Sequence, residues 1–383
     1  MSKFKLEFTL KQHTPIIHFQ SEQMGATLRA TELKPKFDRF LKEYAFGGKI
    51  PKEFKISNEK DALNYKMKII SSEIKKTDIQ KINSRNGKKI PDPLFFGDMG
   101  NQSNPKKFVQ AQETVVECIS FKEDLLNVIS KYFESFLANT NFGTRQSKGY
   151  GSFYINNKIF DTSLIKAQEV YSFQTKNWKN DLKLFYSFLR QGINIPKEFN
   201  KDCPKTRFYA KPLIFLYAKS KGWTWDKKAI KEHYFQAELK NQKKCRRGSD
   251  TLEFVSQEKY LLRDLFGLST DQSWKSYRDN IKKTNDKVAR FKSPIQFKII
   301  DNKVYFWVND VYKKFLDKEF KIVTKRGNDL KLKTPSIEVF DFNDFFKFVQ
   351  KVDIDKVIDS QYHSQQEFLV LKRIMIDIKK AQK

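Results

Sequence analysis

The stretch Asn141–Phe153 reads NFGTRQSKGYGSF and holds three of the chain's 14 glycines together with two cations. Glycine tolerates positive φ and lets another backbone approach closely. Arg145 and Lys148 offer charge to a phosphate, while Thr144 and Ser147 offer hydrogen bonds. This combination is typical of a loop that holds a polyanionic backbone, and we expect RNA to be bound there.

The flanking residues predict that this loop joins a helix to a strand. Apolar residues recur at helical spacing from Leu125 to Leu137, and strand-forming residues resume at 151–155. Nearer the N-terminus, apolar and polar residues alternate from Phe4 to Leu10, which predicts a strand buried on one face. A second apolar stripe, from Leu33 to Tyr44, predicts a helix with Pro35 in its first turn.

The order of helix, glycine-rich basic loop and strand resembles that of the RAMP superfamily, the CRISPR-associated RNA-binding proteins built from ferredoxin-like (RRM-like) folds. The phrase GTRQSKGYGSF carries much of the resemblance, which spans roughly residues 4–155. KFKLEFTLKQHTPIIHF and GATLRATELKPKFDRFL are similar to the family's opening strand, T-P turn and first helix. PLFFGDMGN and FVQAQETVVECI are similar to its LFG segment and the strand after it.

Within the superfamily, the chain resembles the terminal RAMP subunit of type III-B (Cmr) effector complexes, which has a second ferredoxin-like half. ARFKSPIQFKII and the strand after it, joined by a turn at Asp301-Asn302, suggest that half here. We therefore expect an α+β protein with tandem ferredoxin-like domains. The first spans residues 1–158 and carries the glycine-rich loop; the second spans residues 159–383 and adds helices, among them Trp178 to Arg190.

A thumb-like insertion is expected at residues 73–107, where Asn86-Gly87 and scattered prolines and glycines predict a hairpin and a long loop. In RAMP relatives a similar insertion presses on the RNA duplex. The residues expected to bind RNA come from the first helix, the insertion and the loop: Arg29, Lys34, Lys36, Arg39, Arg85, Lys88, Lys89, Gly143, Thr144, Arg145, Gln146, Ser147, Lys148, Gly149, Tyr150 and Gly151. Cations along a helix are also common as plain solvated residues, and that reading stays open for the first helix.

Charge is unbalanced over the whole chain, since 74 Lys and Arg residues stand against 45 Asp and Glu, a formal net charge of +29. Such a surplus repels itself in the folded state unless a polyanion offsets it. AT-rich genomes also inflate lysine, which explains part of the surplus without any partner. That inflation does not explain why cations cluster beside glycines and aromatic residues.

The resemblance implies guide RNA and target RNA as ligands, and other RAMP subunits and a large polymerase-like subunit as protein partners. Phosphates and 2′-hydroxyls should supply most of the affinity, because a guide varies in sequence while the protein does not. A non-catalytic RNA-binding subunit is thus the main interpretation. An unrelated basic DNA-binding protein is an alternative, in which the glycine-rich loop would be coincidental.

We expect no catalytic residue, metal or cofactor. The histidines lack metal-ligand spacing, the loop lacks nucleotide-binding spacing, and Cys118, Cys203 and Cys245 lie too far apart for a zinc knuckle or a disulfide framework. An endoribonuclease that matures the guide stays open through His13 and His18, because related RAMP enzymes use histidine as a general acid or base. Target cleavage stays open through the aspartates of the insertion, which are Asp78, Asp92 and Asp98.

Cellular location can also be predicted. The few, scattered cysteines indicate a reducing compartment, and the opening MSKFKLEFTLK lacks the apolar core of a secretory signal. Nowhere do ~18 apolar residues follow one another, the length that a membrane-spanning helix needs. We therefore expect a cytoplasmic protein with no membrane segment.

Overall fold

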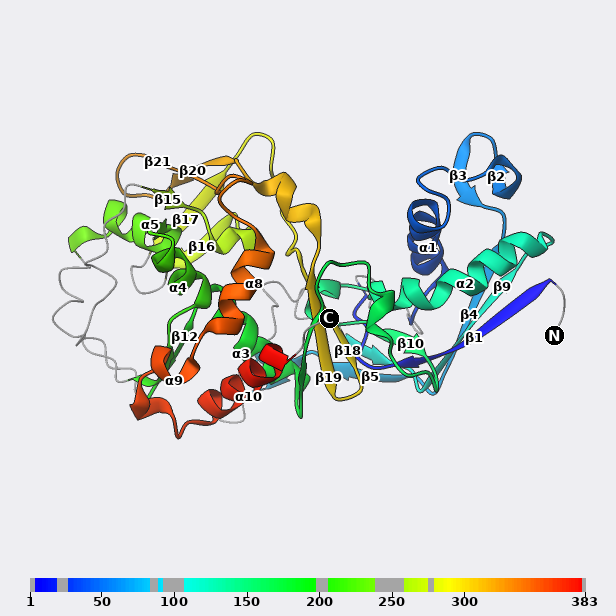
Figure 1. Cartoon of the computed structure of the whole chain (residues 1–383), viewed down its shortest axis with the longest axis horizontal. Helices are drawn as coiled ribbons and strands as arrows, with labels where there is room; N and C mark the ends of the chain where they lie inside the picture. The colour runs from blue at the N-terminus through cyan, green and yellow to red at the C-terminus, as the bar shows by residue number, and fades with distance from the viewer. Residues whose placement is uncertain are drawn as a thin grey trace. The chain divides into compact units, whose positions relative to one another are not determined.

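The computed structural model describes residues 4–18, 27–82, 89–91, 107–197, 206–237, 258–274 and 279–380. The chain divides into two compact units that both contain strands and helices (Figure 1). Unit 1 comprises Met1–Trp178 and Gln296–Phe306, and unit 2 comprises Lys179–Ile295 and Trp307–Lys383. The predicted α+β class is confirmed. The boundary expected at residue 158 falls inside unit 1, and a short segment from the second half of the chain returns to that unit.

Unit 1 is built on a four-stranded antiparallel sheet with the spatial order β10-β1-β9-β4. Its strands are β1 (Lys5–Gln12), β4 (Lys66–Ser72), β9 (Glu113–Ile119) and β10 (Phe153–Ile155). Helix α1 (Ala30–Tyr44) follows β1, and helix α2 (Glu123–Asn139) joins β9 to β10. The chain order is therefore β1-α1-β4-β9-α2-β10.

The two helices cover one side of this sheet (Figure 1). Phe8 of β1 stacks on Phe133 of α2 with ring centroids 4.2 Å apart, and Phe133 meets Phe37 of α1 at 5.3 Å. Side chains alternate between the faces of a strand, so the other face of β1 carries exposed residues such as Glu7 and Lys11. The predicted one-sided burial of the opening strand is confirmed from Leu6 to Leu10, whereas Phe4 precedes β1 and is exposed.

Further short strands of unit 1 lie between α1 and β9 in the sequence. They are β2 (Lys55–Ser57), which follows the turn η1 (Lys52–Phe54), β3 (Lys60–Leu63), β5 (Lys75–Asp78), β6 (Gln80–Ile82), β7 (Lys89–Pro91) and β8 (Lys107–Gln110). The antiparallel pairs β5–β8 and β6–β7 lie where the sequence predicts a hairpin insertion. Arg85 and Lys88 lie outside the described residues, as does the side chain of Lys89.

A second sheet has the order β11-β19-β18, with β11 (Tyr171–Gln174), β18 (Ile295–Ile300) and β19 (Lys303–Val308). The predicted hairpin with its turn at Asp301-Asn302 is confirmed. All six residues of β18 are buried. The glycine-rich loop covers the free edge of this strand, as described below.

Unit 2 contains a six-stranded sheet with the order β14-β15-β21-β20-β17-β16 and a separate pair, β12–β13. The strands are β12 (Ile193–Pro196), β13 (Thr206–Ala210), β14 (Thr224–Trp225), β15 (Lys259–Tyr260), β16 (Asp271–Trp274), β17 (Asp279–Thr284), β20 (Glu319–Val323) and β21 (Leu330–Lys333). The helices are α3 (Trp178–Arg190), α4 (Leu213–Ser220), α5 (Asp226–Tyr234), α8 (Phe342–Lys351), α9 (Ile354–Val357) and α10 (Gln366–Lys380). The helix predicted from Trp178 to Arg190 is confirmed with the same bounds.

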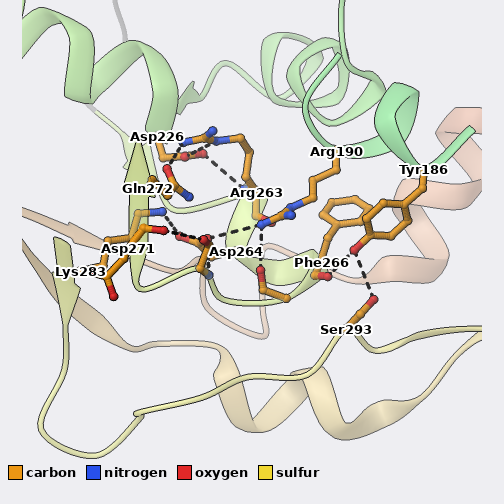
Figure 2. A network of polar contacts seen from close by, with 12 residues as sticks. Tyr186, Arg190, Asp226, Arg263, Asp264, Phe266, Asp271, Gln272, Lys283 and Ser293 are labelled. Atoms are coloured by element: carbon orange, nitrogen blue, oxygen red, sulfur yellow. Dashed lines mark hydrogen bonds and ion pairs between the residues drawn. The ribbon is translucent and has the colours of Figure 1, made fainter. Parts of the chain in front are cut away.

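In unit 2, a buried network of charged side chains connects α3, α5 and the six-stranded sheet (Figure 2). Lys283 of β17 forms an ion pair with Asp264, and both side chains are fully buried. Arg263 donates from Nε to Asp226 at 2.6 Å, and Arg190 of α3 donates to the carbonyl of Arg263 at 3.0 Å. Each buried carboxylate thus has a cation beside it, which offsets the cost of removing both charges from water.

Candidate nucleic-acid interface

The glycine-rich loop, Asn141–Phe153, connects α2 to β10, as the sequence predicts. Its backbone adopts positive φ at Arg145 (59°), Gly149 (82°) and Gly151 (67°), and Gln146–Lys148 form a single 3₁₀ turn. Residues with a Cβ adopt such angles at a cost, which favours glycine at these positions. Arg145 bears that cost directly before the turn.

The glycines of the loop lie against the protein's own chain. A Cβ placed on Gly149 would lie 1.9 Å from Cδ1 of Ile299, and one on Gly151 would lie 1.9 Å from the carbonyl oxygen of Phe142. Gly143 is similarly close to Ile17, with 2.6 Å to its carbonyl oxygen. The tight approaches that glycine permits here are therefore used to fold the loop, and contact of these glycines with RNA stays a prediction.

The T-P turn near the N-terminus is built into the loop. The hydroxyl of Thr14 donates to the carbonyl of Gly149 at 2.7 Å and accepts from the N–H of Ser152 at 2.9 Å. The N–H of Gly151 donates to the carbonyl of Pro15 at 2.9 Å. The T-P turn and the glycine-rich loop, both identified in the sequence, are thus joined by hydrogen bonds.

The start of α1 also holds the loop. The carboxylate of Glu32 accepts from the N–H of Gly143 at 2.8 Å and from Nζ of Lys36 at 2.7 Å. Nζ of Lys36 also lies 3.3 Å from the carbonyl oxygen of Asn141 and 5.0 Å from the ring centroid of Phe142. Lys36 is half-buried, and the contacts of its ammonium group connect α1 to the glycine-rich loop.

The remaining predicted cations of α1 differ in exposure. Lys34 is half-buried and pairs with the buried Asp38 at 2.7 Å. Arg39 is exposed, and its Nε donates to the carbonyl of Pro35 at 3.2 Å. Arg29 is half-buried and stands immediately before the helix. Arg39 is therefore better placed than Lys34 to meet a ligand.

Within the loop, the two cations have different surroundings. Arg145 is exposed, whereas Lys148 is buried with Nζ 5.9 Å from the ring centroid of Phe297. Tyr150 is fully buried, stacked on Phe108 with ring centroids 5.6 Å apart. Arg145 is thus the loop cation that lies on the surface.

The polar residues of the loop have mixed exposure as well. Thr144 and Gln146 are half-buried, and Ser147 is buried. The side chain of Gln146 donates to the carbonyl of Gly143 at 2.5 Å, and the N–H of Thr144 donates to the carbonyl of Ile17 at 2.7 Å. The side chain of Gln146 and the backbone of Thr144 thus help to hold the loop conformation that presents Arg145.

Sequence reasoning missed the strand on which the loop rests. β18 is the outer strand of its sheet, and its free edge accepts two hydrogen bonds from the loop. The side-chain amide of Asn141 donates to the carbonyl of Phe297 at 2.7 Å, and the hydroxyl of Ser152 donates to the carbonyl of Ile299 at 2.7 Å. The one local signal was a lysine, Lys298, inside the apolar run IQFKII.

The two histidines near the T-P turn point into the protein. Nδ1 of His13 accepts the N–H of Asp301 at 3.0 Å, and burial lowers the pKa of this imidazole to about 4. The ring of His18 contacts the carbonyl oxygen of Thr27, and burial lowers its pKa too. Both rings are therefore neutral at pH 7, and one nitrogen of each is occupied by the backbone.

Metal ligands do not gather in the part of the chain that is described, where no group of three or more His, Cys, Asp or Glu side chains has the arrangement of a metal site. Asp78 is exposed at the end of β5, 3.9 Å from Nζ of Lys107. Asp92, Asp98, Cys203 and Cys245 lie outside the described residues. Over the same described ranges, every helix is too short or too polar to cross a membrane.

Comparison with protein families covers nearly the whole chain. The Cmr1 N-terminal domain matches residues 3–193, and the Cmr1 C-terminal domain matches residues 209–380. The chain belongs to the Cmr1 family. This confirms the resemblance to a RAMP-superfamily protein of the type III-B (Cmr) kind. The T-P turn, α1 and the glycine-rich loop fall in the Cmr1 N-terminal match, and β18 falls in the C-terminal one.

Among solved structures, the chain is similar to part of one described as "Cryo-EM structure of the Type III-B Cmr-beta bound to cognate target RNA". The sequences are 12% identical and the TM-score is 0.29, which is too low to carry a structural argument. The match covers 40% of this chain and 59% of that one, less than two thirds of its length. A search of curated proteins finds no match.

Proposed function

We propose that this Cmr1-family chain is a non-catalytic RNA-binding subunit of a cytoplasmic type III-B CRISPR effector ribonucleoprotein, with guide RNA and target RNA as its ligands. The observation that carries the proposal is the convergence of the T-P turn, the start of α1 and the glycine-rich loop. We call six of their exposed and half-buried polar residues the loop face: Arg29, Lys36, Arg39, Thr144, Arg145 and Gln146. Other RAMP subunits and the large subunit are the proposed protein partners.

The fold assignment that accompanies this function is a pair of ferredoxin-like domains. In unit 1 the order β1-α1-β4-β9-α2-β10 is the βαββαβ order of that motif. The chain order of β11, α3, β18, β19 and the C-terminal helices follows the first five elements of the same motif, with an insertion after α3. These two connectivities support the tandem arrangement.

Electrostatic attraction should dominate binding, because the net charge is +29 and a guide must vary in sequence. If ~5 to 8 phosphates are neutralised on single-stranded RNA, log affinity falls against log salt with a slope of about −3.5 to −5.5. Filter binding or fluorescence anisotropy between low and moderate salt measures this slope. A slope near zero would contradict the proposal.

The absence of catalysis is proposed from the histidines, which are the strongest candidates for an enzyme. Both rings are neutral at pH 7 and turned inward, which does not suit a general acid. Incubation of the pure protein with repeat-containing RNA, with and without Mg²⁺, should leave the RNA intact. Discrete cleavage lost in His13→Ala or His18→Ala would favour a processing enzyme, and metal-dependent cleavage lost in Asp98→Ala would favour target cleavage.

The experiment that tests the function as a whole is sequencing of the nucleic acid that copurifies with the tagged protein from its host. Short guide-derived RNAs, together with further RAMP subunits, are the expected result. Random messenger fragments would contradict it. Copurifying DNA in place of RNA would favour the unrelated DNA-binding alternative.

A further inference from the structure

Lys298 occupies the centre of β18 and is fully buried. Lysine side chains are almost never buried completely unless a charged partner accompanies them. We propose that Lys298 is a positioning residue of the glycine-rich loop, because its ammonium group ties the residue that leads into the loop to the residue that ends it. The inference rests on the proposed function for its consequence, which is RNA binding by the loop face.

The contacts of the ammonium group define this role. Nζ donates to the carbonyl of Thr140 at 2.9 Å and to the carbonyl of Phe153 at 3.0 Å, and it lies 3.4 Å from Oδ1 of Asn141. An ammonium group has three N–H donors, and these three oxygens match that number. Thr140 follows α2 and Phe153 begins β10, so one side chain fixes the spacing of the two ends of the loop.

The neighbours of Lys298 along β18 fix other points of the same loop. The carbonyls of Phe297 and Ile299 accept from Asn141 and Ser152, as described above. The side chain of Ile299 fills the space beside Gly149. The loop is thus docked on the strand from its beginning to its end, and Lys298 is the charged centre of that contact.

The partners of Lys298 are neutral oxygens, so the charge itself is not compensated by them. Burial accordingly lowers the pKa of the ammonium to about 7. His13, which is neutral at pH 7, lies within electrostatic reach of Lys298; it contacts Asp301, which pairs with Lys11 at 2.7 Å. A methionine would cost less to bury, and a buried lysine that lowers local stability is characteristic of a functional position.

Two measurements on the full-length chain test this assignment. Hydrogen exchange is compared between the parent and Lys298→Met over residues 140–153, and guide-length RNA affinity is measured on the same samples. We expect exchange in the loop to rise about tenfold and RNA affinity to fall about tenfold. Exchange in β9 and α2 should stay as in the parent, a localisation that a general loss of stability would not produce.

The matched control is Lys303→Met, which removes one charge from the neighbouring strand of the same hairpin, where the side chain is half-buried and lies over Tyr305. It should change neither loop exchange nor RNA affinity. Parent-like exchange over 140–153 in Lys298→Met would overturn the inference, and so would faster exchange with unchanged RNA affinity. A parent protein that binds no RNA would instead defeat the proposed function, while the exchange data would still test the positioning role.

A variant that fails to fold does not end the test. Lys298→Gln keeps two N–H donors and a polar side chain, so it perturbs the buried site less than methionine. Its exchange over 140–153 should lie between those of the parent and a fully loosened loop. Exchange equal to the parent's would show that the ammonium is dispensable and would overturn the inference.

Discussion

Lys283 and Lys298, one in each unit, are the most deeply buried lysines among the described residues, and their surroundings differ. Lys283 of unit 2 meets the fully buried carboxylate of Asp264, within a network that also pairs Arg263 with Asp226. Lys298 of unit 1 meets carbonyl oxygens and an amide oxygen. The first charge is neutralised where it lies. The second has no counter-charge among its hydrogen-bond partners and lies beneath the loop for which we propose an RNA ligand.

The comparison separates two uses of a buried cation. A compensated pair contributes to a fixed arrangement, and removing one member leaves the other charge alone in the interior. An uncompensated cation weakens the fold at neutral pH, yet it shapes a surface and, when protonated, adds positive potential beneath it. If this distinction is correct, breaking the Lys283 pair should affect stability more than RNA binding. Removing the Lys298 ammonium should affect RNA binding more than stability.

The largest effect should follow when Lys283 loses its carboxylate. Asp264→Asn leaves a fully buried ammonium without its counter-charge, and we expect a loss of about 3–5 kcal/mol in the free energy of unfolding. Urea unfolding monitored by tryptophan fluorescence measures this loss. The exposed Asp271 provides the control, Asp271→Asn, which should cost less than about 0.5 kcal/mol. A cost for Asp264→Asn as small as the control's would remove the contrast between the two units.

A somewhat smaller effect is expected where the loop meets β18. Gly149→Ala combines positive φ with a Cβ 1.9 Å from Ile299, so strain and overpacking should together cost about 2–4 kcal/mol. Gly47 is the matched control in the same unit, because its φ is +58° and nothing lies within 4 Å of an added Cβ. Gly47→Ala should cost only about 1 kcal/mol. Equal thermal shifts for the two variants would show that the loop is not packed on β18.

The third effect is a pH dependence that only the uncompensated lysine should show. The pKa of Lys298 is about 7 in the folded protein and about 10.4 when unfolded, so between these values the unfolded chain binds more protons. The free energy of unfolding should therefore rise with pH from about 7 toward 10, by at most about 1.4 kcal/mol per pH unit. This rise should be absent in Lys298→Met. Parallel stability curves for the parent and the variant would argue that Lys298 is not a buried ammonium.

Much of the fold could be predicted because its signals are local. Apolar periodicity placed α1, α2 and α3, and alternation with a turn at Asp301-Asn302 placed the β18–β19 hairpin. The position of the glycine-rich loop between α2 and β10 followed from the same patterns. Each of these elements depends on residues close together in the sequence.

The assembly of the site could not be predicted, since it depends on contacts between distant residues. The residues around Lys298 in IQFKII do not indicate that its side chain contacts a loop that ends at Phe153. Likewise, Arg145 and Lys148 are equivalent basic residues when judged from the sequence. In the structure, the 3₁₀ turn after Arg145 leaves Arg145 exposed and turns Lys148 toward Phe297. Which loop cation is exposed depends on how the loop packs on β18. That packing joins residues far apart in the sequence, so the sequence alone does not reveal it.

The most direct test of the central claim, that RNA is held at the loop face, is the affinity of guide-length RNA for Arg145→Ala at about 150 mM salt. Arg145 is exposed, so its loss should lower affinity by about 10- to 150-fold, which corresponds to one charged hydrogen bond of roughly 1.5–3 kcal/mol. The melting temperature should not change. Arg290→Ala removes an exposed arginine from unit 2 and should leave affinity within about twofold of the parent's. If Arg145→Ala binds as tightly as the parent, or if both variants weaken binding equally, the loop face is not the RNA site.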